Sequence, residues 1–163
     1  MHKVYLGIGG NIGNKEKNFE EVYQIIDNEI GKIIRSSSVY ETPPWGFQAE
    51  EPFWNSIIEI STSLEDLELL WKIQEVEDRF GRKRGKEQYA SREMDIDILY
   101  FDDIYIETKT LIIPHPRIHQ RKFVLVPLAE IAPELKHPLL RLTSLEMLEN
   151  CKDASMIKKV KSL

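Results

Sequence analysis

Hydrophobic and polar residues follow two different periods along this chain, and these periods predict which segments are strands and which are helices. Alternation with a period of two, or a short continuous apolar run, is typical of a strand. On this basis we expect strands at residues 4–8, 32–40, 53–62, 94–101 and 111–113. Apolar residues that recur every three or four positions predict two amphipathic helices, one following Asn14 and one over residues 64–80.

The two predicted helices carry suitable residues at their ends. Asn14 can cap the first helix, and Gly31 stands where a glycine often follows a helix C-terminus. The apolar stripe between them consists of Phe19, Val22, Tyr23, Ile26 and Ile30. Ser63 is expected to cap the second helix, and Gly81 to end it. We expect both stripes to pack into the core.

An acidic residue interrupts the apolar face of the second predicted helix. Glu77 lies on the same stripe as Ile73 and Phe80, and Gln74 lies one position to its side. A buried carboxylate usually has a partner, because an unpaired buried charge is costly. The arginines of the loop that follows are the nearest candidates.

The rest of the chain is shorter and less regular. A turn at residues 102–103 predicts that residues 104–106 return beside the preceding strand as a hairpin. A short helix is expected over residues 143–148, and the basic segment 158–161 is expected to be a solvated, frayed end. Strands interleaved with only two long helices favour an α+β sheet packed by helices over a doubly wound Rossmann fold.

Composition narrows the class of protein. With 163 residues, 42% of them hydrophobic, the chain is expected to form one domain over residues 1–163. Its net charge of −5 argues against broad binding to nucleic acid or to a membrane surface. Cys151 is the only cysteine, which excludes an intramolecular disulfide, and no apolar run approaches a membrane span. We therefore expect a cytoplasmic monomer that acts on small molecules.

Asp95 and Asp97 form the most informative pair in the sequence. They lie two apart in a predicted strand, so they point to the same face with Cα atoms about 6.5–7 Å apart. Neighbouring like charges destabilise a strand, and Mg²⁺ can offset this by binding both carboxylates together with substrate phosphates. The preceding loop, residues 81–92, carries several cations, and cations beside such carboxylates are typical of phosphoryl transfer. A solvated, charged strand face is the alternative.

The glycines after the first predicted strand do not match a known nucleotide-binding loop. A Rossmann fingerprint that starts at Gly7 and Gly9 would need a third glycine where the chain has Ile12. A Walker A motif fails as well, because no Gly-Lys-Ser/Thr follows. We interpret these residues as a tight strand-to-helix turn whose backbone can face a ligand.

Aromatic residues offer two candidate surfaces for a flat ring. The proline-stiffened loop over residues 41–47 presents Trp45 either as a buried corner or as a wall for a heterocycle. Phe53 and Asn55 share one strand face, where they can stack on and hydrogen-bond to one planar ring. Ordinary cross-strand packing explains this pair equally well.

Two further positions suit a phosphorylated ligand and an aromatic one. His115 stands between two prolines, so it is either a fixed surface residue or a positioned phosphate donor. Arg121 can reach a phosphate, and Phe123, two residues later, can stack on a ring.

Several motifs occur together in this sequence. They are Gly7-x-Gly-Gly-Asn-x-Gly13, Tyr40-Glu-Thr-Pro-Pro44, Ser91-Arg-Glu-Met-Asp-Ile-Asp-Ile-Leu99, Pro114-His-Pro-Arg117, Arg121-Lys-Phe123 and Ile131-Ala-Pro-Glu-Leu135. In this combination the chain resembles the 6-hydroxymethyl-7,8-dihydropterin pyrophosphokinases over nearly its whole length. The resemblance implies a ferredoxin-like α+β sandwich, a mostly antiparallel sheet flanked by helices. It also implies transfer of the β,γ-diphosphate of ATP to the pterin hydroxymethyl group with release of AMP, a step of folate biosynthesis.

The resemblance implies roles for particular residues. Asp95 and Asp97 match ligands of two Mg²⁺ ions that bridge the ATP triphosphate, and Arg82 and Arg92 match catalytic cations of the loop before them. The residues implied for ATP binding are Gln74, Glu77, Arg84, Tyr89, Ile98, His115 and Arg121. The residues implied for pterin binding are Thr42, Pro44, Trp45, Phe53, Asn55 and Phe123.

Two other classes of protein have similar sequence features. A nucleotidyltransferase also places Asp-x-Asp on a strand, but it releases pyrophosphate, and the Gly-Ser that usually precedes its acids is missing here. A non-catalytic nucleotide-sensing module on a ferredoxin-like fold would bind ATP without forming AMP. The nucleotide products therefore distinguish the three functions.

Overall fold

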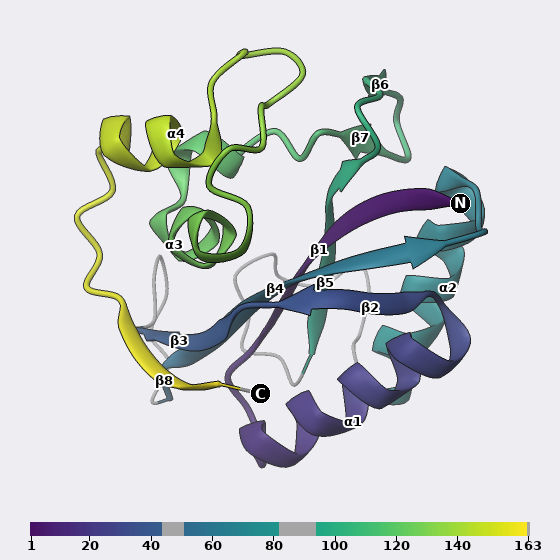
Figure 1. Cartoon of the computed structure of the whole chain (residues 1–163). Coiled ribbons are helices and arrows are strands. Elements are labelled where there is room, and N and C mark those ends of the chain that lie inside the picture. The colour runs from purple at the N-terminus through teal and green to yellow at the C-terminus, as the bar shows by residue number, and fades with distance from the viewer. Residues whose placement is uncertain (44–50, 82–93, 163) are drawn as a thin grey trace.

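The computed structural model describes residues 1–43, 51–81 and 94–162, and its main feature is a six-stranded sheet with helices on both faces (Figure 1). The strands are β1 (His2–Gly10), β2 (Lys32–Ser36), β3 (Ser38–Thr42), β4 (Phe53–Thr62), β5 (Asp95–Phe101) and β8 (Lys158–Ser162). Their order is β5-β1-β4-β3-β8, and β2 also pairs with β4. Every pairing in the described part of this sheet is antiparallel, which confirms the α+β class.

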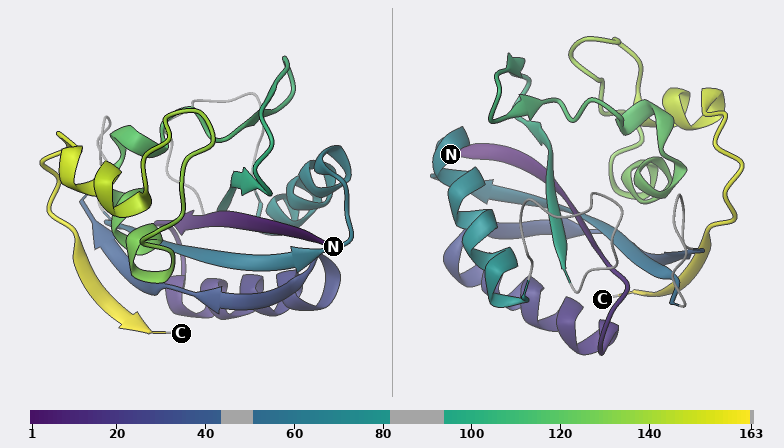
Figure 2. Two further views of the ribbon diagram at one scale, coloured as in Figure 1. Left: turned by 45° about the horizontal axis from the view of Figure 1, so that its top comes forward. Right: turned by 180° about the vertical axis from the view of Figure 1, so that it is seen from behind.

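Helices cover both faces of the sheet (Figure 2), and the buried apolar side chains form two separate hydrophobic clusters. The first lies between the sheet and helices α1 (Lys15–Glu29) and α2 (Asp66–Arg79). The second lies under α3 (Lys122–Ile131) and α4 (Ser144–Asn150), which cover only part of the opposite face. No helix in the described ranges is both long and apolar enough to cross a membrane.

The predicted helices form, and only one of their predicted ends is wrong. Asn14 caps α1, since its Oδ1 accepts a hydrogen bond from the Lys17 backbone at 3.1 Å. The start of α2 lies later than expected, with Glu65 rather than Ser63 at the N-cap position. The Glu65 N–H donates to Glu68 Oε1 at 3.0 Å, and this acidic first turn suits the helix dipole.

The segment 32–40, predicted as one strand, is divided into β2 and β3 by Ser37. The Ser37 N–H donates to the Ile57 carbonyl at 2.8 Å, while its Oγ accepts from the Ile57 N–H at 2.8 Å. Both strands pair with β4. The short helix α4 begins as predicted, with Thr143 as its N-cap.

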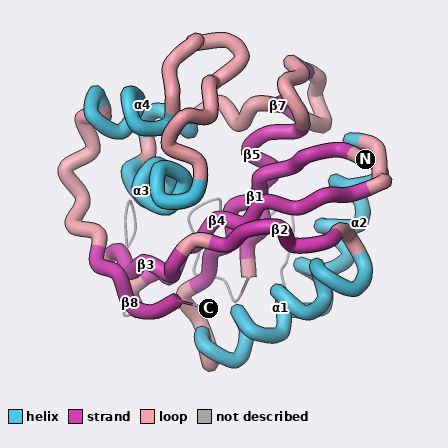
Figure 3. Tube along the Cα trace, in the orientation of Figure 1, coloured by secondary structure: helices cyan, strands magenta, loops and turns pink. Residues whose placement is uncertain are grey.

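Two predictions for the less regular half of the chain are wrong. Residues 104–106 do not return along β5, because β6 (Ile106–Glu107) pairs with β7 (Ile112–Ile113) in a ladder of its own. The basic tail is not frayed, because it forms β8 at the edge of the sheet beside β3 (Figure 3). Lys161 Nζ also lies 2.6 Å from Glu16 Oε1 on α1.

An irregularity in β5 fixes which side chains face which layer. Leu6 of β1 pairs with Ile98 and its neighbour Tyr5 pairs with Tyr100, so Leu99 is an extra residue in β5. Before this bulge, Ile98 packs toward α1 and α2, and the alternate residues point to the opposite face. The alternation predicted for residues 94–101 therefore places the two aspartates on the face that carries α3 and α4.

Candidate active site

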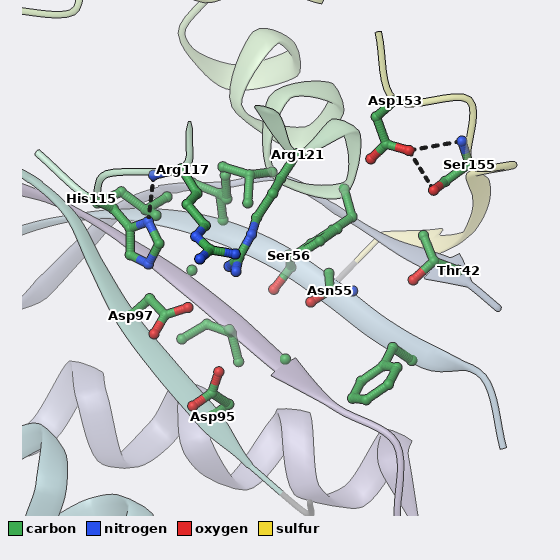
Figure 4. A pocket seen from close by; sticks show the side chains of 18 of the residues that line it. Thr42, Asn55, Ser56, Asp95, Asp97, His115, Arg117, Arg121, Asp153 and Ser155 are labelled. Atoms are coloured by element: carbon green, nitrogen blue, oxygen red, sulfur yellow. Dashed lines mark hydrogen bonds between the residues drawn. The ribbon is translucent and has the colours of Figure 1, made fainter. Parts of the chain in front are cut away.

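A pocket of about 510 Å³ opens on the sheet face that α3 and α4 leave partly uncovered (Figure 4). Its floor comes from β1, β4 and β5, and its walls come from residues 42–43, 115–124 and 153–155. The sequence-predicted residues that line it are Thr42, Phe53, Asn55, Asp95, Asp97, His115, Arg121 and Phe123. Residues from distant parts of the chain thus meet in one cavity, as the resemblance implied.

Two glycines of β1 form the middle of the pocket floor. Gly9 pairs with Asp95 on one side and with Asn55 on the other, and Gly7 pairs with Asp97. A Cβ atom at Gly9 would lie 2.6 Å from Asn55 Oδ1, so any larger residue here would displace the Asn55 amide from its position across the sheet. The predicted strand-to-helix turn is present but starts later than expected, because β1 continues through Gly10 and the turn to α1 lies at residues 11–14. The prediction that the backbone of these glycines can face a ligand is consistent with the structure, since Gly7 and Gly9 line the pocket.

Asp95 and Asp97 stand next to this floor, and both are half-buried. Figure 4 shows their carboxylates directed into the cavity below His115 and Arg117. The described residues contain no cluster of three or more His, Cys, Asp or Glu side chains that could hold a metal ion. Two carboxylates in an open cavity nevertheless suit Mg²⁺, which takes one or two protein carboxylates and completes its shell with water and phosphate.

His115 is fixed beside the aspartates by its own backbone and that of its neighbours. Its N–H donates to the Leu99 carbonyl of β5 at 3.0 Å, and a cis peptide bond joins Ile113 to Pro114 just before it. Its Nδ1 accepts from the Arg117 N–H at 3.2 Å, which leaves the ring proton on Nε2. The imidazole can therefore donate one hydrogen bond into the pocket.

The pKa of His115 is lowered to about 4, chiefly by burial and then by the positive charge of Arg121. The Arg117 charge lowers the pKa further, and Asp95 opposes these effects only in part. The ring is therefore neutral at pH 7. A neutral N–H donor can bind an anionic oxygen without adding another full charge to the site.

Two arginines supply positive charge to the same wall of the pocket. Arg117 and Arg121 flank the single 3-10 turn η1 (Ile118–Gln120), and both guanidinium groups extend into the cavity (Figure 4). The Arg121 Cζ also lies 5.6 Å from the centre of the Phe123 ring, a cation–π distance. Guanidinium groups bind phosphate oxygens well, so this wall suits a phosphorylated ligand.

Comparison with known proteins agrees with this geometry. The model of the family 7,8-dihydro-6-hydroxymethylpterin-pyrophosphokinase (HPPK) matches residues 5–133. The chain belongs to this family. It is 40% identical over 141 residues to the 2-amino-4-hydroxy-6-hydroxymethyldihydropteridine pyrophosphokinase of Aquifex aeolicus, covering 86% of this chain and 87% of the relative. The Bacillus subtilis protein with the same name is 39% identical over 134 residues, covering 82% of this chain and 80% of that one.

Solved structures show the same HPPK fold. The crystal structure of Plasmodium falciparum HPPK-DHPS with SDX-DHP superimposes with a TM-score of 0.73 at 19% sequence identity. The match covers 92% of this chain but only 43% of the longer Plasmodium chain. At this identity the likeness concerns the fold alone.

Three residues that the HPPK resemblance implied for ATP binding do not line the described pocket. Ile98 is 6% exposed and packs in the cluster under α1 and α2. Glu77 is also buried, and its carboxylate accepts a hydrogen bond from the Ile96 N–H at 2.9 Å. It therefore braces β5 from the face opposite the aspartates. The ATP-binding roles of Gln74, Glu77 and Ile98 remain predictions.

Other predicted residues lie outside the described ranges. They are Pro44, Trp45, Arg82, Arg84, Tyr89 and Arg92. The loop arginines that were expected to pair with Glu77 also lie outside the described ranges. Conversely, the sequence reasoning did not assign pocket roles to Arg117, Gln120, Asp153 and Ser155. Arg117 had a usable signal, because it directly follows the Pro-His-Pro segment.

The lowered pKa of His115 predicts an acid-sensitive fold in this HPPK. The imidazole titrates near 6.5 when unfolded and at about 4 when folded, so the unfolded state binds its proton more readily between these values. The free energy of unfolding should fall by up to about 3 kcal/mol as the pH drops from 6.5 to 4. Urea unfolding of the wild type and of His115→Gln over this range measures the difference. Parallel pH dependences in the two proteins would contradict the prediction.

Proposed function

We propose that this chain transfers the β,γ-diphosphate of ATP to the hydroxymethyl group of 6-hydroxymethyl-7,8-dihydropterin and releases AMP, a step of folate biosynthesis. The proposal rests on one observation: a single pocket, in a chain of the HPPK family, is lined by groups that suit phosphate and by groups that suit a flat ring. Asp97, His115 and Arg117 lie toward one end, Asn55 and Thr42 lie toward the other, Phe53 pairs with Thr42, and Phe123 lies beside Arg121. A diphosphate donor and a flat heterocycle with a short alcohol fit these two ends.

At the phosphate end, side chains of the chain itself can bind and orient the triphosphate. His115 Nε2 can donate to a phosphate oxygen, and Arg117 and Arg121 can neutralise charge on others. Asp95 and Asp97 would hold Mg²⁺. When bound, Mg²⁺ offsets the negative charge of the phosphate oxygens and restricts their orientation.

At the other end, the described residues suit a planar ring with a polar edge. Phe53 and Phe123 can each present an aromatic face, and stacked rings gain about 0.5–1.5 kcal/mol beyond the area that they bury. The Asn55 amide offers both a donor and acceptors, which complement the alternating donors and acceptors of a pterin edge. Thr42 and Pro43 limit this end of the pocket.

The reaction needs alignment more than covalent chemistry. The hydroxymethyl oxygen attacks the β-phosphorus and loses its proton, while the bond from the β-phosphorus to the oxygen of AMP breaks. Holding both substrates in one pocket makes the attack effectively unimolecular, and the cationic wall stabilises charge on the transferred group. The reaction requires no covalent nucleophile.

We also infer that one chain is sufficient for activity. The pocket of one chain already contains carboxylates and cations for a phosphorylated substrate and aromatic rings with an amide for a flat one, which supports a monomeric enzyme. Its need for ATP supports a place in the cytoplasm. Its net negative charge gives no reason to expect a nucleic-acid substrate.

The products of one incubation test the proposed function. With Mg-ATP and hydroxymethyl-dihydropterin, we expect AMP and the pterin diphosphate in equal amounts, and no AMP when the pterin is omitted. Resolving the nucleotides by anion-exchange chromatography measures this. Release of pyrophosphate with AMP retained on the pterin would indicate a nucleotidyltransferase, and ATP binding without AMP formation would indicate a sensing module.

A further inference from the structure

The C-terminal segment between α4 and β8, residues 151–157, forms part of the pocket rim. Asp153 and Ser155 both line the cavity, although they lie beyond residue 133, where the family match ends. In Figure 4 they stand toward the end of the pocket with Thr42, away from His115. Pairing of β8 with β3 ties the far end of this segment to the sheet. The rim is therefore anchored on both sides.

Asp153 makes a contact that the start of α3 cannot supply for itself. The N-cap residue of α3 is Arg121, whose side chain extends into the pocket and makes no capping hydrogen bond. Asp153 Oδ2 accepts a hydrogen bond from the Lys122 N–H at 3.0 Å instead. A carboxylate here satisfies a backbone donor of the first helical turn and interacts favourably with the helix dipole.

The Asp153 carboxylate is itself held in place. Its Oδ1 accepts from the Ser155 N–H at 2.9 Å and from Ser155 Oγ at 2.5 Å, so both oxygens have partners. Partial burial acts to raise the pKa of Asp153, but the hydrogen bonds from Ser155 and Lys122 outweigh it and lower the pKa. The group is therefore ionised at neutral pH and acts as a fixed cap.

We propose that Asp153 is a positioning residue for the aromatic end of the pocket: by capping α3 from a distant segment, it fixes the backbone that carries Phe123. This inference rests on the proposed function. Lys122 and Phe123 are the first two residues of α3, so a shift of the first turn moves the ring directly. A phenylalanine has only two side-chain torsions with which to compensate, whereas the long Arg121 side chain can readjust. Pterin binding therefore depends on this cap more than ATP binding does.

Binding measurements on Asp153→Ala test the proposal. We expect its Kd for hydroxymethyl-dihydropterin to rise about 10-fold, and its Kd for a non-hydrolysable ATP analogue with Mg²⁺ to change less than about 2-fold. Asp153→Asn keeps an oxygen acceptor, so its pterin Kd should stay within about 3-fold of the wild type. Isothermal titration calorimetry at a temperature where each variant is fully folded gives both constants.

Thr143→Ala is a matched control, because Thr143 Oγ1 caps the neighbouring helix α4 by accepting from the Glu146 N–H. It should lower Tm about as much as Asp153→Ala, by about 2–4 °C, without changing the pterin Kd. Equal losses of pterin and ATP affinity in Asp153→Ala, an unchanged pterin Kd, or the same loss in Thr143→Ala would overturn the positioning role. Failure of the wild type to bind the pterin would overturn the proposed function itself, and this inference with it.

Discussion

Asp97→Ala is expected to lower turnover by at least about 10³-fold, which corresponds to about 4 kcal/mol of transition-state stabilisation. Asp97 points into the pocket beside Asp95 and opposite Gly7, where no side chain can replace the lost carboxylate. The variant should also bind Mg-ATP more weakly, because one of the two carboxylates proposed to hold Mg²⁺ is gone. Initial rates of AMP formation and titration of Mg-ATP binding measure the two effects.

The same experiment needs a control for charge and for folding. Asp103→Ala removes one carboxylate just beyond β5, where the side chain is exposed and outside the pocket, so it should keep near-normal turnover. Far-UV circular dichroism should show an intact fold for both variants. Near-normal activity of Asp97→Ala would refute its proposed role as a metal ligand.

Local sequence patterns predicted the parts of the fold that local interactions determine. The α1 stripe, its Asn14 cap and the alternation around Asp95 and Asp97 depend on residues within one helix or strand. Periodicity and capping preferences describe such segments well. These patterns also placed both aspartates on one face, which is the geometric basis of the site.

Elements stabilised by distant partners gave no comparable signal. Helix α3 contains Pro127 and an almost continuous apolar run, so nothing in its sequence distinguishes a buried helix from a buried strand. Strand β8 is mostly lysine and is formed by pairing with β3 and by the Lys161 contact to Glu16. Propensity scales cannot include such partners, because they act across more than 100 residues of sequence.

The same distinction applies to the site. Thr42, Asn55 and His115 were assigned through family resemblance, since their separation in the chain hides their proximity. The contribution of Gly9 follows from the Asn55 side chain that passes across it in the folded sheet. Asp153 acts on a helix that begins 31 residues earlier, and no motif marks it. Such residues become visible only when the packing is known.

Phe123→Ala is expected to weaken pterin binding by about 30–150-fold, while the affinity for Mg-ATP changes less than about 3-fold. Phe123 lines the aromatic end of the pocket and is only half-buried without a ligand. Its truncation removes a stacking face, for which lost burial and lost ring–ring interaction together predict about 2–3 kcal/mol. The following residues Val124 and Leu125 remain buried, so α3 should stay folded.

The small change expected in the affinity of Phe123→Ala for Mg-ATP comes from a second contact, because the Phe123 ring also lies 5.6 Å from the Arg121 guanidinium. At a partly exposed site this cation–π contact contributes about 0.5–1 kcal/mol, which sets the small change allowed for ATP. Phe123→Leu separates the two effects: it keeps an apolar side chain of similar reach but no aromatic face. We expect its pterin affinity to lie between those of the wild type and Phe123→Ala. Equal losses of pterin and ATP affinity in Phe123→Ala would show that the ring supports the whole pocket, and stacking on the pterin would then be rejected.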